Sequence, residues 1–176
     1  PDATLMPLKV TNRSTGIGVG VDRMIDAVEY AADNGADIVS ISIGWWVTSA
    51  ANRQMFRQAF ENTLQAGIVV AAAAGNNRES LATYPAPNNI NSPADCPPPY
   101  LHSDQTIQGG LTSVISVGAV DENNVIAGIS SQGPVTWANT TYGDYPYNPG
   151  MGLIRPDIVA PGASVKSLAY DSNTGY

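Results

Sequence analysis

The sequence predicts an α/β fold, a doubly wound and mostly parallel sheet with helices on both faces. Two observations lead to this prediction. Amphipathic helical patterns alternate with short β-branched runs through the first half of the 176-residue chain. The run 68–74 is apolar at every position, which is typical of parallel strands that helices bury and right-handed crossovers connect.

The predicted elements follow one another in alternating order. In the helix over 21–34 apolar residues recur at helical spacing, and Gly35 ends the pattern. A second helix begins after Thr48 or Ser49, either of which is a suitable N-cap, and continues to about Gln65. Strands are predicted over the apolar runs 4–10, 37–43, 68–74, 111–120, 158–160 and 165–168.

The composition excludes several classes of partner. Eight Lys and Arg residues face fifteen Asp and Glu residues, a formal net charge of −7, so neither a nucleic acid nor an anionic membrane surface is expected to bind. The longest apolar run, 68–74, is far shorter than the ~20 residues that span a bilayer. Hydrophobic residues make up 43% of the chain and charged residues only 13%, which allows a packed core and favours a secreted or extracellular location.

Cysteine usage and the first residues add two expectations. Cys96 is the only cysteine, which excludes an internal disulfide and a cysteine-based zinc cluster. We expect it to be a small buried side chain, since a nucleophilic role requires a neighbouring base. The chain opens with Pro1-Asp2-Ala3 and shows no charged-then-apolar leader, so a signal peptide is expected to be absent or to lie upstream.

Two strand ends stand out because ligands of doubly wound sheets bind at the carboxyl ends of the strands. They are Ser42-Ile43-Gly44 and Ala73-Ala74-Gly75-Asn76. Further recognisable sequences are Ser-Pro-Ala at 92–94, Ser-Ser-Gln-Gly-Pro at 130–134 and Arg-Pro-Asp-Ile-Val-Ala-Pro-Gly at 155–162. Together with 35–44, 69–76 and 114–120, these segments closely resemble, in order, the middle of the catalytic domain of subtilisin-like (subtilase) serine peptidases.

The resemblance implies peptide-bond hydrolysis by acyl transfer, with a Ser-His-Asp triad and an oxyanion hole. The family's Asp-Ser/Thr-Gly, His-Gly-Thr and Gly-Thr-Ser-Met-Ala motifs do not occur in the 176 residues. We therefore expect residues 1–176 to form the central part of a single peptidase domain, with long loop excursions at 78–110 and 135–153. The isolated chain is expected to be inactive, and a peptide or protein is the expected substrate of the parent enzyme.

By this resemblance Asn76 is the oxyanion-hole residue, because a neutral amide N–H can point at the developing oxyanion. Asn77 competes for the same role, and Asn76 could instead serve only to tolerate a left-handed turn after Gly75. The resemblance also implies the substrate-binding residues: Ser42, Ile43 and Gly44 as one edge for main-chain pairing, Gly18 within the loop 16–20 as the opposite edge, and Ala73, Ala74 and Gly75 as a wall of the primary specificity pocket.

Other residues leave alternatives open. Val21, Met24 and Ile43 either line a more distal apolar pocket or belong to ordinary core packing. Trp45 and Trp46 either narrow the cleft or form a subunit contact.

No cofactor is firmly indicated. The resemblance allows a calcium ion, with Asp157 as the candidate ligand, against the simpler interpretation of a hydrogen-bonded carboxylate at a strand end. His102 lies outside every motif and is expected at the surface.

Three further hypotheses remain. Gly16-x-Gly18-x-Gly20 suggests a dinucleotide-binding loop, but Val21 replaces the third glycine of the fingerprint and the next strand ends in Gly44 without an acidic residue. Alternatively, the chain is a non-catalytic subtilase-like module that binds peptides or serves as a scaffold. Surface left exposed by the missing flanking segments could also lead to homo-oligomers.

Overall fold

The computed structural model describes residues 2–11, 20–46 and 49–165. The elements in chain order are α1 (Val21–Asp33), β1 (Ile38–Ile41), α2 (Ala50–Gln65), β2 (Val69–Ala73), the short 3-10 helix η1 (Arg78–Ser80), β3 (Val114–Val120) and β4 (Ile158–Pro161). The four strands form one parallel sheet in the order β1-β2-β3-β4. The predicted α/β class and parallel pairing are confirmed.

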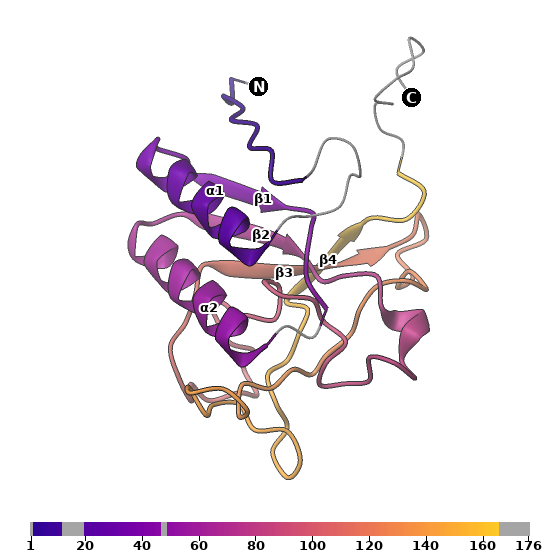
Figure 1. Cartoon of the computed structure of the whole chain (residues 1–176). Helices are drawn as coiled ribbons and strands as arrows, with labels where there is room; N and C mark the ends of the chain where they lie inside the picture. Colours follow the sequence, from indigo (N-terminus) through magenta and orange to yellow (C-terminus); the bar gives the residue numbers. More distant parts are fainter. Residues whose placement is uncertain (1, 12–19, 47–48, 166–176) are drawn as a thin grey trace.

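The register of the ladder brings the strand ends to a common edge. Ile41 pairs with Ala72, and Ala72 pairs with Ser116, so the chain leaves β1 and β2 at nearly the same level. In Figure 1 the arrows of β1, β2 and β3 all point toward the same side of the molecule. Residues that follow β1 and β2 must therefore meet at that side.

Both α1 and α2 pack on the same face of the sheet, where they contact each other (Figure 1). Val70 and Ala72 of β2 point into this core together with Phe56 and Phe60 of α2. On the opposite face, where alternate strand residues point, Ile38, Val69 and Ile158 are 69%, 45% and 54% exposed. In the described part of the chain, helices thus cover one of the two faces on which they were predicted. Neither α1 nor α2 has the length and apolarity that a bilayer span requires.

The remaining predicted elements differ in detail. Residues 4–10 form no strand: they are exposed up to Lys9, and Pro7 has no N–H to contribute to a ladder. The N-cap of α2 predicted at Ser49 is confirmed, since Ser49 Oγ accepts a hydrogen bond from the Asn52 N–H at 3.2 Å. Thr48 and most of the run 165–168 lie outside the described residues, and Val165 itself is not in a strand.

Two arginines of α2, Arg53 and Arg57, are buried. Arg53 pairs with Asp95 at 2.8 Å, and Arg57, which is fully buried, pairs with Asp144 at 2.8 Å. The Trp137 ring lies 4.0 Å from the Arg53 guanidinium and 5.2 Å from that of Arg57. The segment 135–153 is thereby anchored to α2 by paired charges and cation–π contacts.

Cys96 is a free and buried cysteine, as expected. Burial raises the pKa of its thiol well above the ordinary value of 9.0, and the neighbouring Asp95 carboxylate raises that pKa further. The thiol therefore stays protonated and acts as a small core side chain.

Arg57→Ala should lower the free energy of unfolding by about 3–5 kcal/mol, because it leaves the Asp144 carboxylate buried without its cation. Urea unfolding followed by tryptophan fluorescence measures this loss. Arg23→Ala, on the exposed face of α1, is the control and should change stability by less than about 0.5 kcal/mol. The double variant Arg57→Met/Asp144→Leu should recover most of the loss, and equal losses for Arg57→Ala and Arg23→Ala would contradict the assignment.

The raised pKa of Cys96 predicts a pH-dependent stability. Below pH 9 the thiol is protonated in both states, whereas at higher pH the unfolded chain loses the proton first. The stability contributed by the folded thiol is thus lost as pH rises above 9, by up to about 1.4 kcal/mol per pH unit. Urea unfolding at pH 8 and pH 10 should show a larger decrease for the natural chain than for Cys96→Ala; parallel pH profiles would refute this.

Candidate functional site

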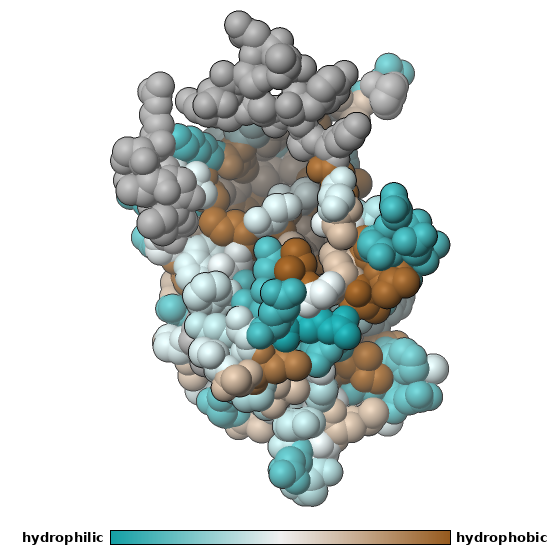
Figure 2. All heavy atoms as spheres, turned by 90° about the vertical axis from the view of Figure 1, so that its right-hand side faces the viewer, coloured by the Kyte–Doolittle hydropathy of each residue, from teal (hydrophilic) through white to brown (hydrophobic). Residues whose placement is uncertain are grey.

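Residues 91–92 form hydrogen bonds both with the segment that follows β1 and with the segment that follows β2. Trp45 and Ser92 form an isolated antiparallel bridge, with backbone N···O distances of 2.9 and 3.0 Å. The Asn91 N–H donates to the Ala74 carbonyl at 2.9 Å. Figure 2 faces this end of the sheet and shows hydrophilic and hydrophobic groups side by side around a hollow in the surface.

Two glycines allow the segments to approach closely. A Cβ on Gly44 would lie 2.9 Å from the Asn91 Cβ. Gly75 has a φ of +112°, and a Cβ there would lie 2.8 Å from the Asn91 Cγ and 2.9 Å from the Ser131 Oγ. A side chain at Gly75 is thus excluded both by the backbone conformation and by its neighbours.

The two adjacent asparagines after Gly75 have opposite environments. The Asn76 side chain is exposed and forms no hydrogen bond with another described residue. Asn77 is only 3% exposed, and its Nδ2 donates to the Asn89 carbonyl at 3.0 Å and to the Asn91 Oδ1. Of the two amides, only that of Asn76 is available to a ligand.

The β1 exit offers backbone groups for pairing. Within the described chain, no backbone hydrogen bond joins residues 42–44 to other residues, and β1 lies at the edge of the four-stranded sheet. Ser42 is exposed, and Ile43 and Gly44 are half-buried. An extended peptide could add at such an edge through main-chain hydrogen bonds. Gly18, predicted on the opposite edge, lies outside the described residues.

The residues predicted as the wall of the primary pocket point in different directions. Ala73 is exposed, whereas Ala74 is 1% exposed and belongs to the core cluster. Only the backbone of Ala74 contributes at this edge, since its carbonyl accepts the Asn91 N–H.

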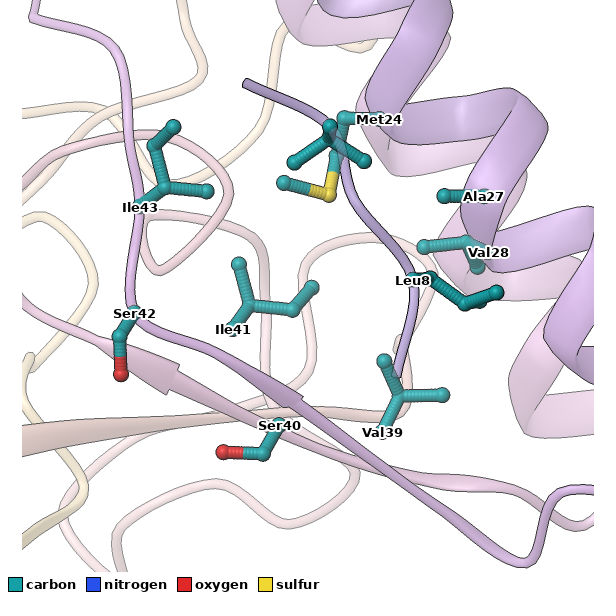
Figure 3. Close-up of a pocket in the computed structure, with 10 residues that line it drawn as sticks. Leu8, Met24, Ala27, Val28, Val39, Ser40, Ile41, Ser42 and Ile43 are labelled. Carbon is teal, nitrogen blue, oxygen red and sulfur yellow. The ribbon is translucent and has the colours of Figure 1, made fainter. Parts of the chain in front are cut away.

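An apolar cavity of about 190 Å³ lies between α1, β1 and the segment 8–10. Figure 3 shows Met24 and Ile43 among the residues that line this cavity. Val21 is buried but is not among the lining residues, which are Leu8, Val10, Met24, Ala27, Val28, Val39, Ser40, Ile41, Ser42 and Ile43. Met24 also belongs to the hydrophobic core cluster. It therefore both packs in the core and lines the cavity.

The two tryptophans after Gly44 have separate roles. Trp45 packs on Phe56 of α2, with ring centroids 5.4 Å apart. Trp46 is 57% exposed, and its ring lies 5.2 Å from that of Tyr84. Trp46 belongs to the segment that follows β1, and Tyr84 to the segment that follows β2. This aromatic pair therefore connects these two segments.

The Asp157 carboxylate has partners within the protein. Its Oδ2 accepts the Ser116 N–H at 2.7 Å and pairs with the Arg155 guanidinium, so the carboxylate already has a cationic partner. In the part of the chain that the structure describes, no three His, Cys, Asp or Glu side chains come together in a metal-binding group. Asp157 is a hydrogen-bonded carboxylate at a strand end, and His102 lies apart from the site, 3.5 Å from Asp104 and exposed.

Sequence reasoning missed the residues that surround Asn77. Asn89 is fully buried: its Nδ2 donates to the carbonyls of Asn77 and Tyr84 at 2.8 and 2.7 Å. Its Oδ1 accepts the Gln132 N–H at 2.8 Å. Ser131 Oγ accepts the Asn77 N–H at 2.9 Å. The available signal was the asparagine-rich run at 88–91, which hydrophobic periodicity does not register.

Comparisons with known proteins agree with this architecture. The family model Peptidase_S8, described as the subtilase family, matches residues 1–176. Subtilisin DY of Bacillus licheniformis is 32% identical over 174 residues, covering 99% of this chain and 47% of the relative. Serine protease AprX of Bacillus subtilis (strain 168) is 31% identical over 184 residues, covering 96% of this chain and 33% of the relative.

A solved structure shows the same fold. A lanthipeptide protease superposes with a TM-score of 0.58 over 77% of this chain and 37% of its own, at 21% identity. The chain spans less than half the length of each of these three proteins. With a family model matched from end to end, the chain belongs to the subtilase family of peptidases.

Proposed function

We propose that this chain is the substrate-binding and oxyanion-hole portion of a subtilisin-like serine endopeptidase. It would form the central part of one peptidase domain, whose catalytic Asp, His and Ser come from sequence outside residues 1–176. The observation that carries this proposal is the contrast between two neighbours. Asn76 presents a free carboxamide at the end of β2, whereas Asn77 is buried and hydrogen-bonded.

The chemistry requires a donor such as Asn76. When a serine attacks a peptide carbonyl, negative charge develops on the carbonyl oxygen. A neutral N–H group stabilises this charge by donating a hydrogen bond to the oxygen. An aspartate at this position would repel the oxyanion. The exposed and unpaired state of the Asn76 amide leaves both of its N–H groups for this interaction.

The substrate would be a peptide or protein bound in extended form. Residues 42–44 would pair with it along one side, and the loop that contains Gly18 would form the other side. Ala73 and Gly75 would border the primary specificity pocket, and the cavity at Met24 and Ile43 would take an apolar side chain further along the peptide. We place the parent enzyme outside the cell, which the sparse charge of the chain supports.

The isolated 176-residue chain should hydrolyse no peptide, because the proposal places its nucleophile elsewhere. Fluorogenic peptide libraries and a fluorophosphonate probe provide the measurement, with an active subtilisin as positive control. Turnover that persists through repurification and disappears on substitution of a residue in this chain would overturn the prediction.

In the full-length protein, Asn76→Ala should lower kcat by about 100- to 1,000-fold, a range established on a subtilisin, which is a member of this family. KM should change little, because the lost hydrogen bond forms in the transition state. Asn88→Ala, which alters an exposed asparagine nearby, is the matched control and should retain activity. A change confined to KM would show that Asn76 contributes to ground-state binding instead.

A further inference from the structure

We propose that Asn77, Asn89 and Asn91 are positioning residues, which hold the turn 75–77 so that the Asn76 carboxamide stays in place for catalysis. This inference rests on the proposed function, since it concerns the residue assigned to the oxyanion hole. Its basis is a network of neutral amides, each of which is buried and engaged with another member.

Asn77 is the centre of the network. Its side-chain amide donates to the Asn89 carbonyl at 3.0 Å and to the Asn91 Oδ1, so both N–H groups are used. Asn89 reciprocates by donating to the Asn77 carbonyl at 2.8 Å. Asn77 and Asn89 are therefore joined by two hydrogen bonds that run in opposite directions.

The backbone on both sides of Asn76 is fixed by the same segments. The Ala74 carbonyl accepts the Asn91 N–H, and the Gly75 carbonyl accepts the Ser131 N–H, each at 2.9 Å. After Asn76, the Asn77 N–H donates to the Ser131 Oγ at 2.9 Å. Asn76 itself takes part in none of these bonds, so its side chain is presented from a turn whose neighbours are held.

Such an arrangement favours catalysis because a donor that is already in place needs no reorganisation as charge develops. A displacement of about 1 Å in a reacting group can cost about 100-fold in rate. The network also consists of amides and one hydroxyl, without a carboxylate. It therefore orders the turn without placing a negative charge beside the developing oxyanion.

The test uses the full-length protein with Asn77→Asp and Asn89→Asp, each alone and combined with Asn76→Ala. An aspartate at 77 has no N–H to donate to Asn89 or Asn91. An aspartate at 89 loses two donors but keeps the acceptor for the Gln132 N–H. Asn88→Asp, an exposed neighbour, is the matched control for the added charge. Active-site titration normalises each rate to the folded molecules.

We expect Asn77→Asp to lower kcat by about 10- to 100-fold with KM nearly unchanged, and Asn89→Asp to act in the same direction. In the Asn76→Ala background the same substitutions should lower kcat by less than about twofold, because the residue they position is gone. Equal effects in both backgrounds would overturn the positioning role and leave the proposed function intact. Unchanged kcat for Asn76→Ala would refute the oxyanion role and, with it, this catalytic inference.

A second measurement does not depend on activity. In the full-length protein, ¹⁵N relaxation should show the Asn76 backbone amide as ordered as those of β2. Asn77→Asp should lower its order parameter from about 0.85 toward 0.6, whereas Asn88→Asp should leave it unchanged. An unchanged order parameter in Asn77→Asp would refute the positioning role whatever the kinetics show.

Discussion

The turn at Gly75 is the constraint on which the arrangement of the site depends. The chain leaves β2 in a left-handed conformation, with φ at +112°, and passes between Asn91 and Ser131 with no room for a Cβ. Asn76 comes out of this turn exposed, and Asn77 comes out of it buried. A chain that continued as a strand would also alternate its side chains, but it would not bring Asn77 onto Asn89 and Asn91.

The segment that meets this turn is itself anchored to the body of the fold. Four residues after Asn91, the Asp95 carboxylate pairs with Arg53 of α2, and the Asp95 carbonyl accepts the Trp137 Nε1–H at 2.9 Å. The excursion 135–153 packs on α2 through the same arginine. Residues distant in sequence thus reach the strand ends through one continuous set of buried polar contacts, which explains why charged side chains occupy the core side of α2.

The sequence was sufficient for elements that depend on local patterns. α1, the N-cap at Ser49 and the apolar strands β2 and β3 follow from helical spacing, capping chemistry and β-branched runs. Residues 4–10 look like a strand locally, but pairing requires a partner, and β1 has none on that side among the described residues. Arg57 was missed because its burial depends on Asp144, 87 residues away, which no local window contains.

Asn76 and Asn77 show the same difference between features that follow from local sequence and features that depend on distant partners. Local sequence alone leaves Asn76 and Asn77 chemically equivalent, and resemblance alone favours the first. Their difference comes from partners 12 and 14 residues further along the chain, which bind Asn77 and leave its neighbour free. A buried, unpaired carboxamide would be costly, so the network that satisfies Asn77 is also what makes its burial possible. The hydrogen bonds of Asn77 to Asn89 and Asn91 therefore account both for the burial of Asn77 and for the free amide of Asn76.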